Sequence, residues 1–544
     1  MLFAALLLAL CLVLFTWRLS ATPLEDFDEA YYAEGAREML ERGDLLTPYY
    51  NGKPFLLKPV LIYWLIAGAF SFFGVTEFAA RAGSAFLGTV VVLGTYWFGA
   101  RALSPRAGFL AGLSLALSYM WVDIARDASI DVPLTAALAP AMFLFFLGMA
   151  APAARKRRWY LASYPLFGLA LLAKGPAPTM VVLVGLSGYL LAAGRLRATL
   201  SEARLLPGLI IALAVAAPWY VYEALHQPEF LQTFFLREHF GHVQGELART
   251  EPWWGHVKNM LVYFLPWAAF LPAAVLYAFR QERGHVLRFA AWWAAAVVVV
   301  FSFAQAKLAH YLAPAFPAAA LLVGGWFDAW LRRERVSRAA TLSAFALLSV
   351  VGLACLIAAA LGAAEHPRLM EAVRERYGDW TPGPAPLVML SALGVGFIAS
   401  AAAAKRRRQA AAPLLAAAML VAAFGHVGWF KPRQARIQAQ PRKELAKLAS
   451  AALLESEPLG VYYAKRNATI FYARRPIVDL GEREDEFPGL VKFLSSPAPA
   501  TALTHAQFVT QLEESLPRVH VWTRRGDYVL VSNRELTLSG RRWE

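Results

Sequence analysis

The amino-acid sequence predicts a polytopic α-helical membrane protein followed by a small soluble α/β domain. The 544 residues are 58% hydrophobic with a mean hydropathy of +0.45, and the apolar residues gather in runs long enough to cross a bilayer. Charged residues make up 17% of the chain and lie between these runs. From residue 431 onward the long runs stop, and short β-rich segments such as LGVYYA and DYVLVS replace them.

The first apolar run, MLFAALLLALCLVLFTW, is expected to be a retained transmembrane helix. No basic residue precedes it, and LFTWRLSATPL offers no small-x-small cleavage site, so it does not resemble a signal peptide. Further apolar runs lie near residues 59–75, 83–100, 107–124, 132–150, 159–173, 176–194, 205–222, 259–279, 289–304, 311–331, 339–362, 385–404 and 411–430.

Basic clusters between the apolar runs predict the topology. The clusters are RALSPR (101–106), RKRR (155–158), RLRATLSEAR (195–204), RQERGHVLR (280–288), RRERVSR (332–338) and KRRR (405–408). They recur after every second run, and Lys and Arg collect in cytoplasmic loops. The net charge of +15 therefore indicates membrane orientation, not a nucleic-acid partner.

The run 59–75 is expected to lie along the membrane interface instead of crossing it. It is short for a span, and it opens with Tyr63 and Trp64, which favour the headgroup level. This choice gives about thirteen transmembrane helices in residues 1–430. It also places the loops 18–82 and 223–258, and the α/β domain 431–544, in the periplasm.

Two kinds of site are disfavoured by the residues present. Cys11 and Cys355 both lie in apolar runs, so they are expected to be buried hydrophobes and not disulfide partners or metal ligands. No Walker A motif is found, which argues against an ATP-driven pump.

The acidic stretch after the first run, EDFDEAYYAEGAREMLERGD (25–44), predicts an amphipathic helix that starts at Asp28. Most of its acids are interpreted as a solvated helix face. Asp28 is the exception, because a carboxylate at the helix start can point into a cavity and deprotonate or orient an acceptor hydroxyl. Glu29, Tyr31 and Tyr32 are expected to line the same cavity.

Three further outer-face residues allow two interpretations each. Lys58, before Pro59, is either a lysine that reaches up to the headgroups or a cation that holds a lipid-linked phosphate. Asp131 in ARDASIDVP is either a helix N-cap or a catalytic carboxylate. Lys174 in LLAKGP is again either a snorkelling residue or a functional cation.

Two later segments add more candidates. The loop FFLREHFGHVQGELARTEPWWGHVK carries Arg237, His239 and His242, a set better suited to binding phosphate than metal. A divalent metal at His239 and His242 stays an alternative, although the tight zinc spacing is absent. The segment FSFAQAKLAHYLAP supplies Lys307 and Tyr311, beside His310, at the entrance of a helix bundle.

Together these residues place carboxylates and several cations on one face of the membrane. The cations would stabilise the charge that develops on a leaving lipid phosphate, while a carboxylate manages the acceptor. The pattern predicts transfer of a group from a lipid phosphate.

An ordered set of motifs in residues 1–330 resembles the GT-C-type integral-membrane glycosyltransferases. The motifs are DEAYYAEGAREML, KP followed by YW, RDASIDVPL, LLAKGP, PWY, REHF and FSFAQAKLAHYLAP. They are most similar to those of the bacterial aminoarabinose lipid A transferases and their protein O-mannosyltransferase-like relatives. The sequence departs from that pattern at Leu57, where those enzymes carry Glu, and at His242, where members often carry Arg.

The resemblance implies a monomeric inner-membrane enzyme of lipopolysaccharide modification, of the kind that gives polymyxin resistance. Its donor would be a sugar, with 4-amino-4-deoxy-L-arabinose as the candidate, linked to undecaprenyl phosphate, and its acceptor lipid A. Asp28 matches the family's catalytic carboxylate. Lys58, Arg237 and Tyr311 would bind the donor phosphate, and Asp131 would be a second acid in the cavity.

Two alternatives remain open on sequence grounds. The same chemistry could serve a protein or glycan acceptor. A lipid-linked substrate transporter or flippase is the alternative from another class, but such proteins carry ionisable residues near the bilayer midplane and often inverted repeats. Here the ionisable groups lie at helix ends and in loops, and no repeat is evident.

Overall fold

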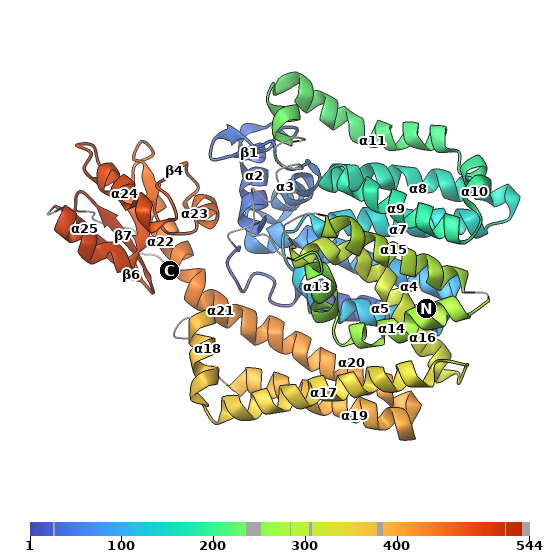
Figure 1. The fold of residues 1–544 in the computed structure, drawn as a ribbon. Helices are drawn as coiled ribbons and strands as arrows, with labels where there is room; N and C mark the ends of the chain where they lie inside the picture. Colours follow the sequence, from blue (N-terminus) through green and yellow to red (C-terminus); the bar gives the residue numbers. More distant parts are fainter. Residues whose placement is uncertain are drawn as a thin grey trace. The chain divides into compact units, whose positions relative to one another are not determined.

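The computed structural model describes residues 1–25, 28–234, 252–282, 284–303, 307–377, 384–516 and 518–535. Within these ranges the chain forms two compact units, coloured along the sequence in Figure 1. The first unit comprises residues 1–18, 56–62 and 81–429. The second comprises residues 19–55, 63–80 and the chain from 430 onward. Each unit is described by itself.

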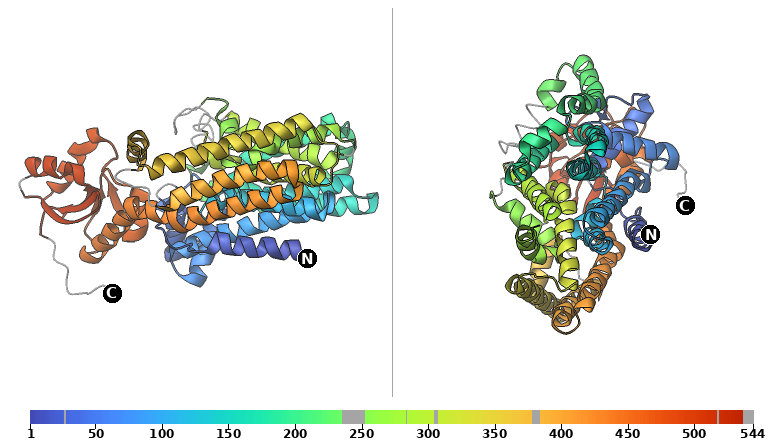
Figure 2. Two further views of the ribbon diagram at one scale, coloured as in Figure 1. Left: turned by 90° about the horizontal axis from the view of Figure 1, so that it is seen from below. Right: turned by 90° about the vertical axis from the view of Figure 1, so that its right-hand side faces the viewer.

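The first unit is a helix bundle. Its helices are α1 (Leu2–Thr16), α4 (Glu77–Ala102, of which the first turn belongs to the second unit), α5 (Pro105–Ala116), α6 (Tyr119–Ile124), α7 (Asp131–Ala150), α8 (Ala153–Lys174), α9 (Ala177–Ala192), α10 (Leu196–Glu202), α11 (Leu205–His226), α13 (Gly255–Tyr263), α14 (Leu271–Arg280), α15 (His285–Ser302), α16 (Phe316–Leu331), α17 (Arg338–Ala363), α18 (Pro367–Tyr377), α19 (Pro384–Arg406) and α20 (Arg408–Gly425). Short 3-10 helices η2 (Trp267–Phe270) and η3 (Ala309–Ala315) precede α14 and α16, and the π-helix η4 (His426–Phe430) follows α20. Figure 2 shows the long helices α17, α19 and α20 running alongside one another.

The bundle makes the chain a multi-pass membrane protein. Eight helices of the described residues are long and apolar enough to cross a membrane, or nine if the bent pair α13 and η2–α14 counts as one span. The predicted thirteen spans are therefore not confirmed. The run 107–124 is divided between α5 and α6, and the run 259–279 bends by 110°.

The segment expected at the interface forms a short helix, α3 (Leu61–Phe73). Its 13 residues rise by about 20 Å, which is less than the ~30 Å of a hydrocarbon core. The helices α1 and α9 are also shorter than a typical span, so length alone does not distinguish α3 from them.

Small residues allow close helix contacts in the middle of the bundle. A Cβ atom on Gly108 of α5 would lie 2.4 Å from the amide nitrogen of Ala100 and 2.5 Å from the carbonyl oxygen of Tyr96, both in α4. On α16, a Cβ on Gly324 would lie 2.5 Å from the amide nitrogen of Ala111. The helix α5 is thus packed backbone to backbone against both neighbours, as small-residue contacts permit in membranes.

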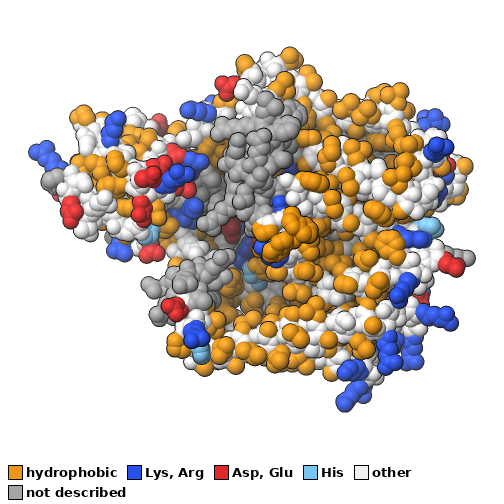
Figure 3. All heavy atoms as spheres, in the orientation of Figure 1, with side chains coloured by type: hydrophobic (Ala, Val, Ile, Leu, Met, Phe, Trp, Pro, Cys, Tyr) orange, Lys and Arg blue, Asp and Glu red, His pale blue; other side chains and the backbone are white. Residues whose placement is uncertain are grey.

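The connections that carry the basic clusters lie at one end of the bundle, near α10 and the turn between α16 and α17 in Figure 1. Exposed Lys and Arg side chains gather there, whereas hydrophobic side chains cover the helices (Figure 3). Asp328 of α16 is 1% exposed and binds Arg332, Arg106 and the hydroxyl of Ser104. The gathering of Lys and Arg side chains at this end of the bundle is what the positive-inside rule expects of a cytoplasmic face.

The buried guanidinium of Arg126 anchors α1. It donates to the carbonyl oxygens of Leu14 (2.8 Å) and Trp17 (2.9 Å), where α1 ends. A cation at a helix C-terminus satisfies the last carbonyl groups. Burial, and then the nearby Arg81, lowers the pKa of Arg126 to about 10, so the side chain keeps its charge at neutral pH.

The second unit contains a five-stranded mixed sheet. The elements that belong wholly to this unit, the five strands β3–β7 included, are α2 (Asp28–Arg42), β1 (Tyr49–Tyr50), β2 (Lys53–Pro54), α21 (Lys431–Gln438), α22 (Gln440–Ala452), β3 (Leu459–Val461), α23 (Arg466–Ala473), β4 (Ile477–Asp479), η5 (Glu484–Glu486), α24 (Phe487–Leu494), β5 (Thr501–His505), η6 (Ala506–Phe508), α25 (Val509–Ser515), β6 (His520–Arg525) and β7 (Tyr528–Ser532). The strand order is β4-β3-β5-β7-β6. The strands β4, β3 and β5 are parallel, and β7 and β6 continue the sheet antiparallel.

The sheet has its own hydrophobic core, formed by Tyr462, Phe487, Leu490, Leu512 and Val529 among others. An α/β arrangement is therefore present from β3 onward, as the sequence predicts. The compact unit is larger than the predicted domain 431–544, however, because residues 19–55 and 63–80 pack on this segment. The helix α2 contacts α23 directly.

Candidate active site

A buried carboxylate, Asp131, lies at the start of α7 in the first unit. Its side chain is 1% exposed. The amide of Asp131 donates to the hydroxyl of Ser129 (3.2 Å), and the hydroxyl of Thr135 donates to the carbonyl oxygen of Asp131 (2.7 Å). These bonds fix the backbone of the first helical turn. The helix starts without a side-chain N-cap bond, so capping is not what holds the Asp131 carboxylate in place.

The Asp131 carboxylate binds Lys174, the last residue of α8. The Nζ atom of Lys174 lies 2.6 Å from Oδ1 of Asp131, and the lysine side chain is only 13% exposed. The same Nζ lies 4.1 Å from the centre of the Tyr311 ring and 5.8 Å from that of Phe301. Lys174 therefore points into the protein, where a carboxylate and an aromatic face stabilise its charge.

The 3-10 helix η3 brings His310 and Tyr311 to this pair. Nε2 of His310 lies 3.8 Å from Oδ2 of Asp131. This oxygen is buried and accepts no hydrogen bond within the described part of the chain. A protonated His310 or a ligand hydroxyl can therefore use it as an acceptor. Asp131, Lys174, His310 and Tyr311 are called the Asp131 cluster below.

Lys307 makes a different contact. Its Nζ donates to the carbonyl oxygen of Ser302 (3.0 Å), the last residue of α15. The side-chain amide of Asn259 in turn donates to the carbonyl oxygen of Lys307 (2.9 Å). Lys307 is 6% exposed. Lys307 is thus a cation that satisfies a carbonyl group at the C-terminal end of a helix.

The candidates of the first loop belong to the second unit. Asp28 is the first residue of α2 and is half-buried. Glu29 is 4% exposed, and its Oε2 accepts a hydrogen bond from the amide of Glu25 (2.8 Å). Tyr31 packs on the rings of Tyr50 and Phe55, at 4.2 and 4.4 Å between ring centres. These contacts give Glu29 and Tyr31 structural roles in the loop.

Tyr32 is also a packing residue, because it is 1% exposed and lies edge-on against Tyr63, 5.7 Å between ring centres. Lys58 is half-buried between β2 and α3 and belongs to the first unit, unlike Asp28. A meeting of Asp28 with Lys58 and the Asp131 cluster thus stays a prediction. Arg237, His239 and His242 lie outside the described residues.

The interpretation of the α2 acids as a solvated face is wrong for Glu34 and Glu38. Glu34 is fully buried and Glu38 is 6% exposed. The two acids can be buried because arginines compensate their charges. Arg37 binds Glu34 (2.5 Å) and Glu41 (2.6 Å), and Arg42 lies 3.6 Å from Glu38. Only Glu41, with a side chain 59% exposed, fits the expected solvated face.

Sequence reasoning left His310 out of the chosen site residues, although it stands beside Tyr311 in the same motif. The structure adds it through its distance to Asp131. No group of three or more His, Cys, Asp and Glu residues in the described part of the chain is placed to hold a metal ion.

Comparisons with known proteins decide the family. Residues 57–222 match the family model described as dolichyl-phosphate-mannose-protein mannosyltransferase. The chain is 30% identical over 391 residues to the undecaprenyl phosphate-alpha-4-amino-4-deoxy-L-arabinose arabinosyl transferase of Aeromonas salmonicida, which covers 70% of this chain and 69% of that protein. The chain belongs to the GT-C-type family of the aminoarabinose transferases. The resemblance inferred from the motifs is thereby confirmed.

Other aminoarabinose transferases agree with this assignment. The protein of that name from Pseudomonas aeruginosa strain LESB58 is 31% identical over 347 residues, or 61% of this chain and 60% of that one. The crystal structure of ArnT from Cupriavidus metallidurans bound to undecaprenyl phosphate covers 99% of both chains, with a TM-score of 0.80 and 23% identity. The fold is thus that of an aminoarabinose transferase. As a member of this family, the chain is a glycosyltransferase that uses a polyprenyl-phosphate-linked sugar donor.

Proposed function

We propose that the protein moves 4-amino-4-deoxy-L-arabinose from undecaprenyl phosphate to lipid A, on the periplasmic side of the bacterial inner membrane. The names of the relatives support this sugar and this carrier lipid. The single observation that carries the proposal is the Asp131 cluster. It presents a buried ammonium, an aromatic face and a carboxylate oxygen that can still accept a hydrogen bond.

The chemistry follows from charge. The bond between the sugar carbon and the donor phosphate oxygen breaks, and its electron pair stays on the polyprenyl phosphate. The acceptor oxygen forms the new bond to that carbon. Lys174 supplies positive charge for the departing phosphate, with Lys58, Arg237, Tyr311 and, by sequence, Lys307 as further phosphate-binding groups.

Two carboxylates have separate roles in this proposal. Asp28 accepts the proton of an acceptor hydroxyl, or orients the acceptor when the attacking oxygen is already ionised. Asp131 holds the ammonium of Lys174 at 2.6 Å and so keeps the cation pointing inward. Because the Asp131 carboxylate is already engaged by Lys174, the proton transfer is assigned to Asp28.

A protein or glycan acceptor is the second candidate. The observation that favours it is the family model matched by residues 57–222, whose description names a protein mannosyltransferase. The donor side of the reaction is the same in both cases, so only the acceptor separates them.

Mass spectrometry of lipid A tests the proposal. Lipid A from cells that express the protein is expected to carry added aminoarabinose, and lipid A from cells without it is not. Unmodified lipid A in both strains, together with a newly glycosylated protein or glycan, would favour the second candidate.

A further inference from the structure

The second unit joins two parts of the chain that are far apart in sequence. Residues 19–55 form the first loop, and the segment from 430 onward carries the sheet. The helix α2, which starts with Asp28, packs on α23. Polar contacts tie both ends of the first loop to α23 and to β4, the strand that follows α23.

The first contact lies just before α2. The hydroxyl of Tyr472, on α23, accepts a hydrogen bond from the amide of Leu24 (2.8 Å) and donates one to Oε1 of Glu77 (3.0 Å). Leu24 is fully buried. Lys443 of α22 binds the same oxygen of Glu77 at 2.5 Å, so the hydroxyl of Tyr472 is itself held in place.

Glu25, the residue after Leu24, is also bonded to the first turn of α2. The amide of Glu25 donates to Glu29 (2.8 Å), and the amide of Ala30 donates to the carbonyl oxygen of Glu25 (3.0 Å). Asp28 lies between these fixed points. If the hydrogen bond between the amide of Leu24 and the hydroxyl of Tyr472 were lost, the start of α2 would lose one of its supports. The carboxylate of Asp28 lies there.

The second contact lies after α2. The side chain of Asn51 donates to the carbonyl oxygen of Ile477 (3.0 Å) and accepts from the amide of Ile477 (2.9 Å). Tyr50 bonds to Asn467 through its hydroxyl. The strand β4 lies at the edge of the sheet with β3 on one side, and Asn51 supplies the hydrogen-bonding partner for the backbone of Ile477.

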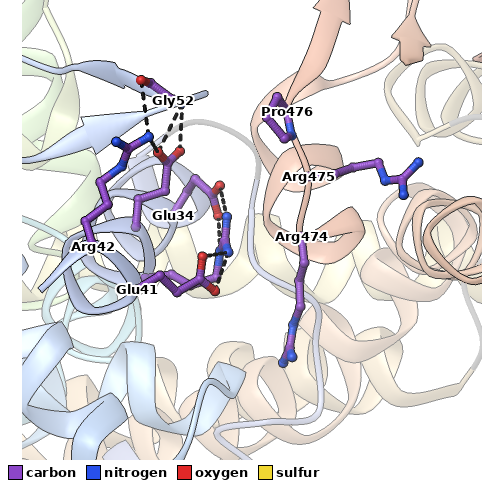
Figure 4. A pocket seen from close by; sticks show the side chains of 9 residues that line it. Glu34, Glu41, Arg42, Gly52, Arg474, Arg475 and Pro476 are labelled. Atoms are coloured by element: carbon purple, nitrogen blue, oxygen red, sulfur yellow. Dashed lines mark hydrogen bonds and ion pairs between the residues drawn. The ribbon is translucent and has the colours of Figure 1, made fainter. Parts of the chain in front are cut away.

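The middle of α2 also faces the C-terminal segment. Figure 4 shows Glu34, Glu41 and Arg42 on one side of a pocket, with Arg474 and Pro476 on the other. The pocket encloses about 220 Å³.

We propose that α23 is a positioning element for the transfer reaction. Its Tyr472 holds Leu24, which precedes α2, and thereby sets the position of the Asp28 carboxylate. This inference rests on the proposed role of Asp28. It gives the C-terminal segment a function, because that segment then supplies the fixed support of a catalytic loop. A displacement of about 1 Å in a reacting group costs on the order of a hundredfold in rate.

The test compares Tyr472→Phe with Tyr462→Phe in the full-length protein. Both changes remove one phenol hydroxyl that makes hydrogen bonds, but the hydroxyl of Tyr462 bonds to the carbonyl oxygen of Arg483 and not to the first loop. The donor is undecaprenyl phosphate-linked aminoarabinose, the acceptor is lipid A, and hydrogen–deuterium exchange is followed in the peptide 24–34. For Tyr472→Phe we expect a kcat reduced by about ten- to a hundredfold, a donor KM within twofold, and faster exchange in that peptide. Tyr462→Phe is expected to change none of these.

Asn51→Ala, which loosens the other end of the loop, is expected to raise exchange in residues 46–55 and also to lower kcat. The result that overturns the inference is wild-type kcat and wild-type exchange for Tyr472→Phe while Asp28→Asn is inactive. Full activity of Asp28→Asn would instead refute the proposed role of Asp28. The exchange measurement would then still decide whether Tyr472 anchors the loop.

Discussion

At the scale of single residues, the position of Lys174 is the most informative finding. A lysine at a helix end in a membrane protein commonly extends to the headgroups. Here the side chain is 13% exposed and its ammonium is shared between Asp131 and the Tyr311 ring. A buried ion pair costs desolvation energy, and residues that carry this cost inside membrane proteins are commonly functional.

Asp131→Asn tests the pair. The substitution leaves the buried ammonium of Lys174 without its compensating charge, so the free energy of unfolding is expected to fall by about 3–5 kcal/mol. Transfer activity is expected to be lost as well. Thermal unfolding of the purified protein and the transfer assay measure the two effects.

The double variant Asp131→Asn/Lys174→Met is the matched control. It removes both charges and should recover most of the lost stability, because no buried charge is left unpaired. Activity should stay absent, since the cation is gone. If Asp131→Asn alone keeps wild-type stability and activity, the pair has no such role.

The sequence was sufficient to choose Asp131, Lys174 and Tyr311 as candidates, because ionisable groups next to apolar runs are rare. It was not sufficient to pair them. The three residues lie at positions 131, 174 and 311, on α7, α8 and η3, and only the packing of these elements shows that the carboxylate meets the lysine. The burial of Glu34 was missed as well, although its partner Arg37 lies only three residues away, because burial depends on which elements pack on α2.

At the scale of elements, α5 shows how small residues set the distances in the bundle. Gly108 lies against the backbone of α4, and Gly324 of α16 lies against the backbone of α5. The helices themselves were predictable from apolar runs. The break between α5 and α6, and the bend after α13, were not, because local hydropathy is the same on both sides of such breaks.

Gly108→Ala and Gly94→Ala make a matched pair of substitutions. Both glycines lie in the bundle, but a Cβ on Gly94 of α4 has no atom within 4 Å, whereas one on Gly108 overlaps the backbone of α4. Alanine favours a helix over glycine by about 1 kcal/mol, so Gly94→Ala should be neutral or stabilising. Gly108→Ala should lower the free energy of unfolding by about 1–3 kcal/mol through overpacking. Equal melting temperatures for the two variants would contradict the close contact.

At the scale of the whole molecule, the orientation of the first loop decides whether the proposed chemistry has access to its substrates. The basic connections gather at one end of the bundle (Figure 3), which the positive-inside rule assigns to the cytoplasm. The first loop is predicted on the opposite side.

Cysteine labelling tests this orientation. Cys11 and Cys355 are replaced by alanine, and single cysteines are placed at the exposed positions Ala21, in the first loop, and Arg407, between α19 and α20. A membrane-impermeant maleimide added to intact spheroplasts should label Ala21→Cys and not Arg407→Cys, while permeabilised cells should allow both. Labelling of Arg407→Cys alone in intact spheroplasts would show that the topology is the reverse of the predicted one.

The most direct test of the central claim is transfer by purified Asp28→Asn. Wild-type protein given undecaprenyl phosphate-linked aminoarabinose and lipid A should form glycosylated lipid A and release undecaprenyl phosphate. Asp28→Asn should keep the wild-type melting temperature and donor binding but lose at least a hundredfold in rate, on the order of what a general base contributes. A wild-type rate for Asp28→Asn, or donor movement across the membrane without a new covalent product, would contradict the account.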